Sequence, residues 1–214
     1  MRRGIAHRLE AVARFRERIV AMHETLARTL THEVGKPIRQ SRNELNGLLP
    51  RIDFFLAQVD AAVGERTVYD EAGMTERIGH DPLGLVANIS AWNYPYFVGG
   101  NVFVPALLTG NALLYKPSEF ATLTGLHIAR LLHESGVPAD VFVPLAGKSV
   151  DMPWLAEQGH AVFGVELAEL GVEQVFAEQR LDAEVEQTRN GPLWRSGPID
   201  LLCGDVFALD VQDL

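Results

Sequence analysis

The stretch VFVPLAGKSVDMPWLAEQGHAVFGVE, residues 141–166, decides how the chain folds and where it divides. An apolar segment runs into a turn that contains Gly147, a helical segment follows, and a second apolar segment ends at Glu166. This order is typical of the first half of a βαβ unit that binds a nucleotide. Glu166 lies nineteen residues after Gly147, and a carboxylate that binds a ribose diol is expected about 20 residues after such a turn.

The charge of the chain changes at the same point. Residues 1–140 hold 15 Lys and Arg against 15 Asp and Glu, whereas residues 141–214 hold 4 against 13, which accounts for the net charge of −9. Such a step supports a domain boundary, although acidic helix surfaces within one domain would produce it too. We therefore predict two domains, residues 1–140 and residues 141–214.

The overall composition excludes several classes of protein. With 47% hydrophobic and 22% charged residues, the chain is ordinary globular material. Its negative charge argues against nucleic-acid partners, and no apolar run reaches the 18 or so residues that span a membrane. One cysteine, Cys203, rules out an internal disulfide and fits a reducing compartment, and the N-terminus lacks the pattern of a signal peptide. We expect a cytoplasmic protein.

The first part of the chain begins with a helical hairpin. Apolar residues recur every three or four positions between Ile5 and Val34, which predicts one long amphipathic helix. Gly35-Lys36-Pro37 ends this helix, and a second helix is expected over residues 39–62, with Pro50 as the place where it would kink.

After a polar, hairpin-like stretch at residues 65–80, strands and helices alternate. The expected order is strand 83–89, helix 97–108, strand 111–115 and helix 121–135. Such alternation predicts a parallel sheet with right-handed crossovers, whose ligands bind beyond the carboxyl ends of the strands. Two polar clusters follow the strands, at residues 92–95 and 116–119.

The alternation restarts at residue 141. The expected order is strand 141–145, helix 150–158, strand 161–166, helix 169–179, a polar loop over 180–197 and strand 199–203. The fold class is therefore α/β, with two incomplete Rossmann-like parallel-sheet modules, the first preceded by a long helical hairpin. The alternative is one continuous α/β sheet, because both modules are built from parallel βαβ units.

The turn after the first strand of the second part is not a phosphate-binding loop. Gly147-Lys148-Ser149 lacks the glycine that a P-loop places five residues earlier, where Phe142 stands, and no G-x-G-x-x-G pattern is present. One glycine turn and two strand-end carboxylates, Glu166 and Asp205, suit an adenosine-containing cofactor without a phosphate to hold. S-adenosylmethionine (SAM) fits this description, and its positive sulfonium is compatible with an acidic module.

Several ordered motifs in residues 5–142 point to a known family. They are GKP at 35–37, PLGLV at 82–86, WNYP at 92–95, PALLTGNA at 105–112, KPSE at 116–119 and GVP at 136–138. Together they resemble the NAD-binding region of aldehyde dehydrogenases. The resemblance implies that Asn93 donates an amide N–H to the oxyanion formed when a thiolate attacks an aldehyde. It also implies that Lys116 and Glu119 bind the adenosine ribose of NAD, with Trp92 and Ser118 nearby. An Asx-turn for Asn93 and an exposed strand-end cation for Lys116 stay open as alternatives.

A second set of motifs covers residues 141–210. They are VPLAGKS at 143–149, WLAEQGH at 154–160, GVEL at 164–167, FAEQ at 176–179 and LLCGDVF at 201–207. This set resembles bacterial thiopurine S-methyltransferases. The resemblance implies that Leu145 and Gly147 line the cofactor turn, that Glu166 binds the ribose hydroxyls of SAM, and that Asp205 and Val206 flank the adenine.

Both resemblances lack parts that their chemistry needs. An aldehyde dehydrogenase needs a nucleophilic cysteine and a glutamate base beyond residue 142, and we interpret Cys203 as a buried small hydrophobe instead. A thiopurine S-methyltransferase needs an aromatic segment before its first strand and an acceptor site after the region matched here. We therefore expect a fusion of two truncated sequences, catalytically impaired or inactive, with Asn93 as a vestigial oxyanion donor and no metal site.

Two alternatives remain for the function. One is a methyltransferase-like protein that still binds SAM, and the other is an aldehyde-dehydrogenase-like oxidoreductase fragment that binds NAD or packs its helices on a partner. Beyond a small-molecule nucleotide cofactor we expect no nucleic-acid or membrane partner. Truncated half-sheets would expose strand edges and apolar patches, so self-association is also expected.

Overall fold

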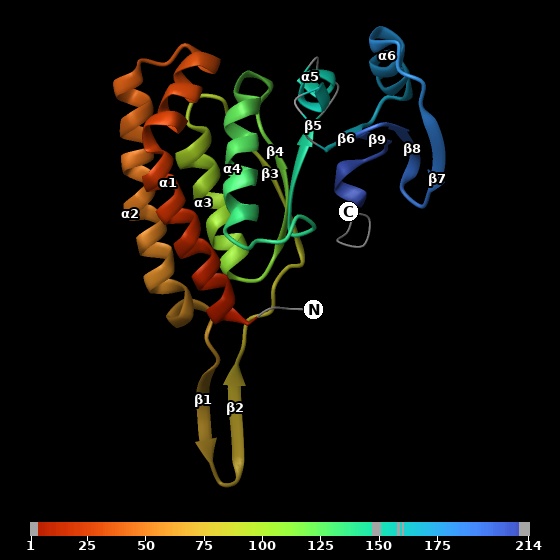
Figure 1. The fold of residues 1–214 in the computed structure, drawn as a ribbon. Helices are drawn as coiled ribbons and strands as arrows, with labels where there is room; N and C mark the ends of the chain where they lie inside the picture. Colours follow the sequence, from red (N-terminus) through yellow and green to blue (C-terminus); the bar gives the residue numbers. More distant parts are fainter. Residues whose placement is uncertain (1–3, 147–150, 158, 160, 210–214) are drawn as a thin grey trace.

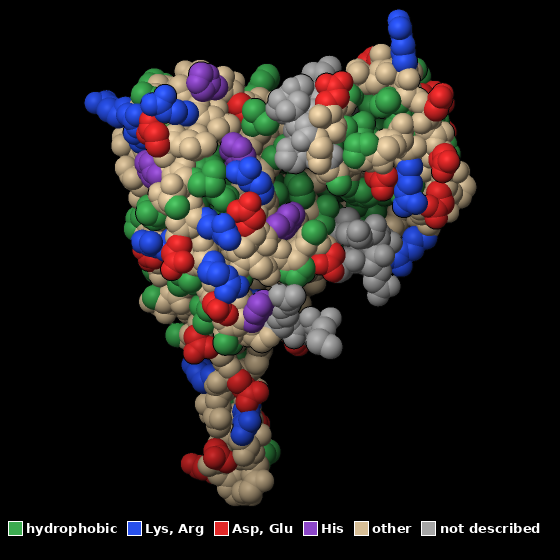
Figure 2. Space-filling model, viewed as in Figure 1, with side chains coloured by type: hydrophobic (Ala, Val, Ile, Leu, Met, Phe, Trp, Pro, Cys, Tyr) green, Lys and Arg blue, Asp and Glu red, His purple; other side chains and the backbone are tan. Residues whose placement is uncertain are grey.

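The described α-helices all lie on one side of a seven-stranded sheet (Figure 1). The computed structural model describes residues 4–146, 151–157, 159 and 161–209. None of its described helices is long and apolar enough to cross a membrane. Positive and negative side chains are interspersed over the helical surface seen in Figure 2.

The predicted helical hairpin is confirmed. Helix α1 spans Ile5–Val34 and helix α2 spans Ile38–Val63, with Pro50 inside α2. Helix α1 ends at Gly35, whose positive φ of 67° is the left-handed conformation that glycine adopts without strain. The apolar stripe of α1 faces the core through fully or nearly fully buried side chains: Val12, Phe15, Ile19, Leu26 and Leu30. This burial, rather than helix propensity, supplies most of the stability of such a hairpin.

The polar stretch that follows α2 is a two-stranded antiparallel hairpin. Strand β1 spans Arg66–Glu71 and strand β2 spans Met74–Ile78, as the sequence predicted. The hairpin extends away from the body of the molecule (Figure 1), and all its residues are exposed. No described residue therefore covers the hairpin, and a lone two-stranded hairpin is marginally stable in water.

The seven-stranded sheet has the order β3-β4-β5-β6-β9-β8-β7. Strands β3 to β6 and β9 are parallel, and β8 and β7 complete the sheet in antiparallel pairing. The bounds are β3 Leu85–Ile89, β4 Ala112–Lys116, β5 Phe142–Ala146, β6 Val162–Glu166, β7 Glu184–Thr188, β8 Gly191–Ser196 and β9 Ile199–Cys203. The connecting helices are α3 Pro95–Leu108, α4 Thr122–Glu134, α5 Asp151–Glu157 and α6 Glu169–Gln179, with short 3-10 turns η1 Glu119–Ala121 and η2 Val206–Ala208.

The two predicted half-sheets are joined through β5. Leu113 of β4 pairs with Phe142 of β5, and Leu145 of β5 pairs with Phe163 of β6. The α/β class is confirmed, and of the two arrangements that the sequence left open the structure has the continuous sheet. Phe142 is completely buried and makes close ring contacts with Phe103 and Tyr115, at centroid distances of 5.8 and 5.2 Å. Such pairs contribute about 0.5–1.5 kcal/mol each beyond area burial, so the first part of the chain holds β5 firmly.

The prediction of a polar loop over residues 180–197 is wrong, because this segment forms the β7–β8 hairpin. Its first strand is mostly polar and exposed at the edge of the sheet, so it lacks the apolar alternation that predicts a strand. Gly191 begins β8 with φ of 125°, and a Cβ there would collide with the carbonyl oxygen of Cys203. Glycine at this position therefore allows β8 to approach the end of β9.

Alternate residues of the strands pack on opposite faces of the sheet. On the helical face, two clusters of buried side chains join the strands to α1–α4 and to α5 and α6. On the other face, a third cluster consists of Leu114, Leu145, Leu193, Leu202 and Leu209. These five leucines are buried although no described α-helix covers this face, and the cavities described next lie on it.

Candidate cofactor-binding site

The carboxyl ends of the five parallel strands meet at one edge of the sheet. Residues predicted to bind cofactors from both parts of the chain therefore lie along the same edge. Trp92 and Asn93 follow β3, Lys116, Ser118 and Glu119 lie at the end of β4, Leu145 lies near the end of β5, Glu166 ends β6, and Asp205 and Val206 follow β9. Gly147 lies outside the described residues.

A cavity of about 170 Å³ opens on the helix-free face close to this edge. We call it the edge cavity, and it is lined by Ala87, Ile89, Leu114, Lys116, Leu145, Val165 and Val206. It brings together Lys116, predicted for NAD, with Leu145 and Val206, predicted for SAM. The other predicted residues are not among its lining side chains, although they belong to the same edge.

Polar groups lie at and just after the end of β4, and Lys116 among them lines the edge cavity. The Lys116 ammonium group donates to the carbonyl oxygen of Pro117 at 2.8 Å. The Ser118 hydroxyl accepts the N–H of Phe120 and donates to the carboxylate of Glu119, both at 3.3 Å. The Glu119 side chain is exposed, so residues 116–119 carry both a charged donor, Lys116, and a carboxylate acceptor. This pair fits the donor and acceptor capacity of ribose hydroxyls.

The carboxylate at the end of β6 is held by the first turn of α6. One oxygen of Glu166 accepts the N–H of Ala168 at 3.1 Å. The stem of Glu166 lies against Gly171, because a Cβ added at Gly171 would be 3.0 Å from the Cγ of Glu166. The side chain is half-buried and Asp205 beyond β9 is exposed, so two carboxylates are present at this end of the edge.

Cys203 is half-buried, which is less than the burial expected from the sequence. Its Sγ lies 3.9 Å from the carbonyl oxygen of Leu167. Partial burial, and then the negative charges of Glu169 and Glu166, raise the pKa of the thiol. A raised pKa keeps the thiol protonated, which disfavours a role as nucleophile.

The loop after β3 is anchored by a buried ion pair. The Lys36 ammonium group lies 2.5 Å from the Glu44 carboxylate, and their side chains are 8% and 0% exposed. The same ammonium donates to the carbonyl oxygen of Asn93 at 2.7 Å and lies 3.6 Å from the ring centroid of Tyr94. The Asn93 and Trp92 side chains remain exposed, so the backbone of the loop is held while these side chains face solvent.

Glu44 also caps helix α3. Its second oxygen accepts the N–H groups of Tyr96 and Phe97 at 2.8 and 3.1 Å. A carboxylate at a helix N-terminus satisfies N–H groups that have no partner within the helix. Burial raises the pKa of Glu44, and its hydrogen bond with Lys36 is the largest influence in the opposite direction.

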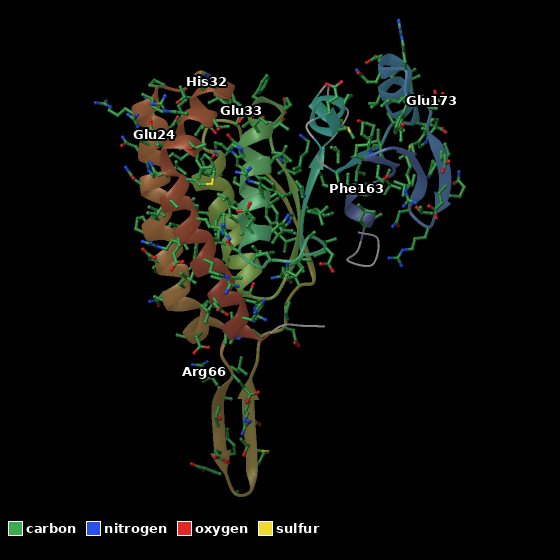
Figure 3. The ribbon with its side chains drawn as sticks, in the orientation of Figure 1. Glu24, His32, Glu33, Arg66, Phe163 and Glu173 are labelled. Atoms are coloured by element: carbon green, nitrogen blue, oxygen red, sulfur yellow. The ribbon has the colours of Figure 1, made fainter. Side chains whose placement is uncertain are left out.

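Glu33 has the same role at helix α4. Its carboxylate accepts the N–H groups of Leu123 and Thr124 at 2.6 and 2.8 Å, and the Thr124 hydroxyl at 2.6 Å. Glu33 lies near the end of α1 beside α4 (Figure 3). The turn of the helical hairpin therefore holds the loops that follow β3 and β4. The turn itself was predicted from the sequence, but the roles of Lys36, Glu33 and Glu44 were not. Charged residues on the buried side of two amphipathic helices were the available signal.

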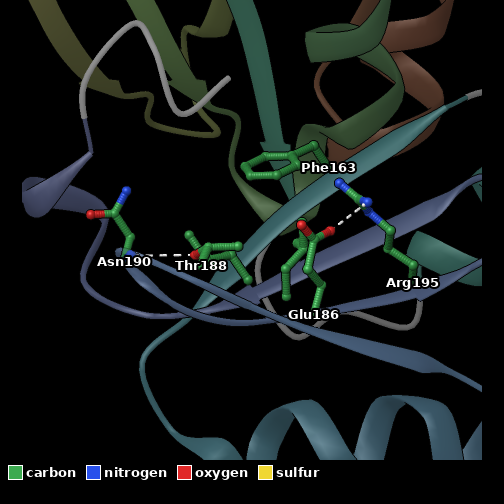
Figure 4. A pocket seen from close by; sticks show the side chains of 7 residues that line it. Phe163, Glu186, Thr188, Asn190 and Arg195 are labelled. Carbon is green, nitrogen blue, oxygen red and sulfur yellow. Dashed lines mark hydrogen bonds and ion pairs between the residues drawn. The ribbon is translucent and has the colours of Figure 1, made fainter.

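A second cavity lies on the same helix-free face, and none of the predicted residues lines it (Figure 4). Its volume is about 210 Å³, and its lining consists of Phe163, Glu186, Thr188, Asn190, Leu193, Arg195 and Leu202. Arg195 and Glu186 form an exposed ion pair at 2.8 Å across its rim. Within the β7–β8 turn, the Thr188 hydroxyl donates to the carbonyl oxygen of Gly191 at 2.7 Å and accepts the N–H of Asn190 at 3.3 Å.

Two family patterns match the chain. The pattern of the aldehyde dehydrogenase family matches residues 2–157, and that of thiopurine S-methyltransferase matches residues 120–214. The matches overlap over residues 120–157, which contain α4, β5 and α5. The two-part resemblance predicted from the sequence is thereby confirmed.

The chain has relatives of both kinds. The chain is 32% identical to 3,6-anhydro-alpha-L-galactose dehydrogenase of Streptomyces coelicolor, over 92% of this chain and 44% of the relative. It is 54% identical to thiopurine S-methyltransferase of Stutzerimonas stutzeri, over 36% of this chain and 33% of the relative. The chain thus spans less than half the length of either relative.

Solved structures agree with the first of these similarities. An NAD-dependent aldehyde dehydrogenase from Sinorhizobium meliloti superposes with a TM-score of 0.62 at 25% identity, over 83% of this chain and 36% of that one. PnpE in complex with nicotinamide adenine dinucleotide superposes with a TM-score of 0.61 at 28% identity, over 82% of this chain and 36% of that one.

Proposed function

The chain belongs to the aldehyde dehydrogenase family, and we propose that it binds the adenosine part of a nucleotide cofactor at the carboxyl edge of its sheet. The edge cavity is the observation that carries this proposal, because it is the place where predicted cofactor residues from both parts of the chain come together. Its position beyond the ends of parallel strands is where ligands bind in α/β sheets.

The residues at the edge fit an adenosine group chemically. The cavity walls are aliphatic apart from Lys116, which suits the face of a purine base. Lys116 and Glu119 at one end, and Glu166 at the other, are suited to ribose hydroxyls. NAD is the cofactor of the family to which the chain belongs, and it supplies a hydride acceptor when bound.

We propose that aldehyde oxidation by this chain is impaired. The predicted oxyanion donor, Asn93, follows β3, whereas the one cysteine of the chain, Cys203, ends β9. Three strands lie between β3 and β9, so the two are four strand spacings apart, which corresponds to about 19 Å. A nucleophile and an oxyanion donor must both lie about 3 Å from the reacting atoms. The raised pKa of the Cys203 thiol adds to this mismatch.

SAM binding is the second candidate. It is favoured by Glu166, which ends the strand next to β5 and is oriented by α6, and by the similarity to a thiopurine S-methyltransferase. Methyl transfer requires a thiolate in line with the sulfonium, which is a positioning effect. We propose that this activity is impaired too.

Isothermal titration of the full chain with NAD and with SAM, separately, tests the binding proposal. Micromolar binding of either cofactor supports it, and absence of heat with both refutes it. Lys116→Ala should weaken NAD binding and Glu166→Gln should weaken SAM binding, each about tenfold. Glu173→Gln, an exposed change on α6, is the matched control and should leave both affinities unchanged. Aldehyde-dependent formation of NADH by the purified chain would contradict the proposed impairment.

We also propose self-association through β3, one of the two outermost strands of the sheet. Ile89 of β3 is 71% exposed and Leu83 just before it is 88% exposed, whereas the β7 edge carries Glu184 and Glu186. An apolar outermost strand such as β3 can pair with a strand of another molecule, whereas the charged side chains of β7 disfavour such pairing. Analytical ultracentrifugation that finds only monomer over a wide concentration range would refute this. A cytoplasmic location is inferred from the single cysteine.

A further inference from the structure

The edge cavity is built by both parts of the chain at once. Ala87, Ile89, Leu114 and Lys116 come from the region that matches aldehyde dehydrogenases alone. Val165 and Val206 come from the region that matches thiopurine S-methyltransferases alone. Leu145 belongs to β5, the strand that both matches include. The side chains from the strands meet because they point to the same face of one continuous sheet.

The size of the cavity limits what it can hold. Its volume of about 170 Å³ is below the range of about 300–1,000 Å³ typical of pockets for whole small-molecule ligands. A space of this size can accept one planar aromatic base but not two. The cavity is apolar over most of its wall, which suits the face of a base and leaves the polar parts of a ligand to the edge.

The polar groups that would grip a ribose lie on both sides of this one space. Lys116 and Glu119 are at the end of β4, and Glu166 is at the end of β6. Only β5 lies between these strands, so the two sets are about 10 Å apart at the usual strand spacing. Two separate adenosine sites along this short stretch would need two base pockets, and the second cavity is lined from β6 to β9 and by no residue of β4 or β5.

We infer that NAD and SAM share the edge cavity as a single adenine site, so that binding of one excludes the other. The inference rests on the proposed function, because it requires that adenosine cofactors bind here. It goes further by assigning one site to two cofactors that the parent families bind separately. The joining of the two half-sheets through β5 is the structural cause of this exclusion.

A competition titration of the full chain tests the inference. NAD is titrated into the protein at increasing fixed concentrations of SAM, and the apparent Kd of NAD is measured. Direct competition raises this Kd without limit, by about tenfold when SAM is present at ten times its own Kd. An apparent Kd that does not change, or that reaches a plateau, overturns the shared site while the proposed function stands. Binding of only one cofactor has the same meaning, and binding of neither overturns both.

A variant that fills the cavity gives an independent measurement. Ala87 is exposed on the edge strand β3 and lines the cavity, so Ala87→Trp should fill the space without disturbing the buried core. We expect at least a tenfold loss of affinity for both cofactors. Glu186→Trp, an exposed strand position that borders the second cavity, is the matched control and should leave both affinities unchanged. Loss of only one affinity in Ala87→Trp overturns the inference, and circular dichroism establishes that both variants are folded.

Discussion

Replacing Lys36 by Met should lower the free energy of unfolding by about 3–5 kcal/mol, because it leaves a buried carboxylate without its positive partner. Lys36 and Glu44 lie 2.5 Å apart, and their side chains are 8% and 0% exposed. Met keeps an apolar stem of similar length and removes the ammonium group, so the change in packing is small. In a chain of this size, the loss corresponds to a fall of about 6–20 °C in Tm, measured by circular dichroism.

The effect of Lys36→Met should depend on pH. Burial raises the pKa of Glu44, whereas the hydrogen bond and the charge of Lys36 lower it. The folded state therefore binds a proton on Glu44 at a higher pH than the unfolded state does. Folding becomes more favourable as the pH falls through the folded-state pKa and less favourable as it rises. Without Lys36 this pKa rises further, so the destabilisation should be largest above the folded-state pKa of Glu44 and shrink as the pH falls through it.

Two controls separate the buried pair from a general loss of charge. Arg28→Met removes a cation from an exposed pair with Glu24, and its effect should be a small fraction of that of Lys36→Met. Lys36→Met combined with Glu44→Gln removes both charges and keeps an oxygen for the N–H groups of α3, so it should recover part of the stability. The reasoning is refuted if Lys36→Met behaves like Arg28→Met, or if its effect is the same at every pH.

Three further outcomes are expected. Gly191→Ala should weaken the pairing of β8 with β9, because the added Cβ would collide with the carbonyl oxygen of Cys203; a urea midpoint equal to that of the parent would contradict this. Glu33→Gln should cost about 1–2 kcal/mol by weakening the bonds to the first N–H groups of α4, measured by urea unfolding. Cys203 should react with a disulfide reagent more slowly than the unfolded chain near pH 8, because burial and then Glu169 raise the thiol pKa; equal rates would argue against it.

Periodicity predicted the regular elements well where one face of each is buried. Helix α1 has the predicted bounds, since its apolar stripe repeats without interruption from Ile5 to Val34. Helix α6 and strand β9 also have the predicted bounds. The β7–β8 hairpin was missed because its first strand lies at the sheet edge and carries exposed polar residues. Such a strand is held by backbone pairing, and that pairing leaves no trace in the hydrophobic pattern.

The candidate site was predicted only in part. Motif resemblance placed residues at the strand ends, such as Lys116 and Glu166, because strand ends can be located from the sequence. The anchoring of the loops by Lys36, Glu44 and Glu33 was not predicted. These contacts join residues 52 to 91 positions apart, and local pattern says nothing about which helix end a distant carboxylate will meet.

The sequence by itself determined the α/β class, the helical hairpin and the change of family resemblance near residue 141. These features depend on local periodicity, on short motifs and on charge counts, which are properties of neighbouring residues. Only the tertiary structure decided that the two parts form one sheet. Phe142 begins β5, and its burial against Phe103 and Tyr115 ties the strand to the first part while β6 pairs on its other side. Because the pairing of a strand depends on contacts distant in the chain, the stretch 141–166 was compatible with both a separate module and a shared sheet until its neighbours were known.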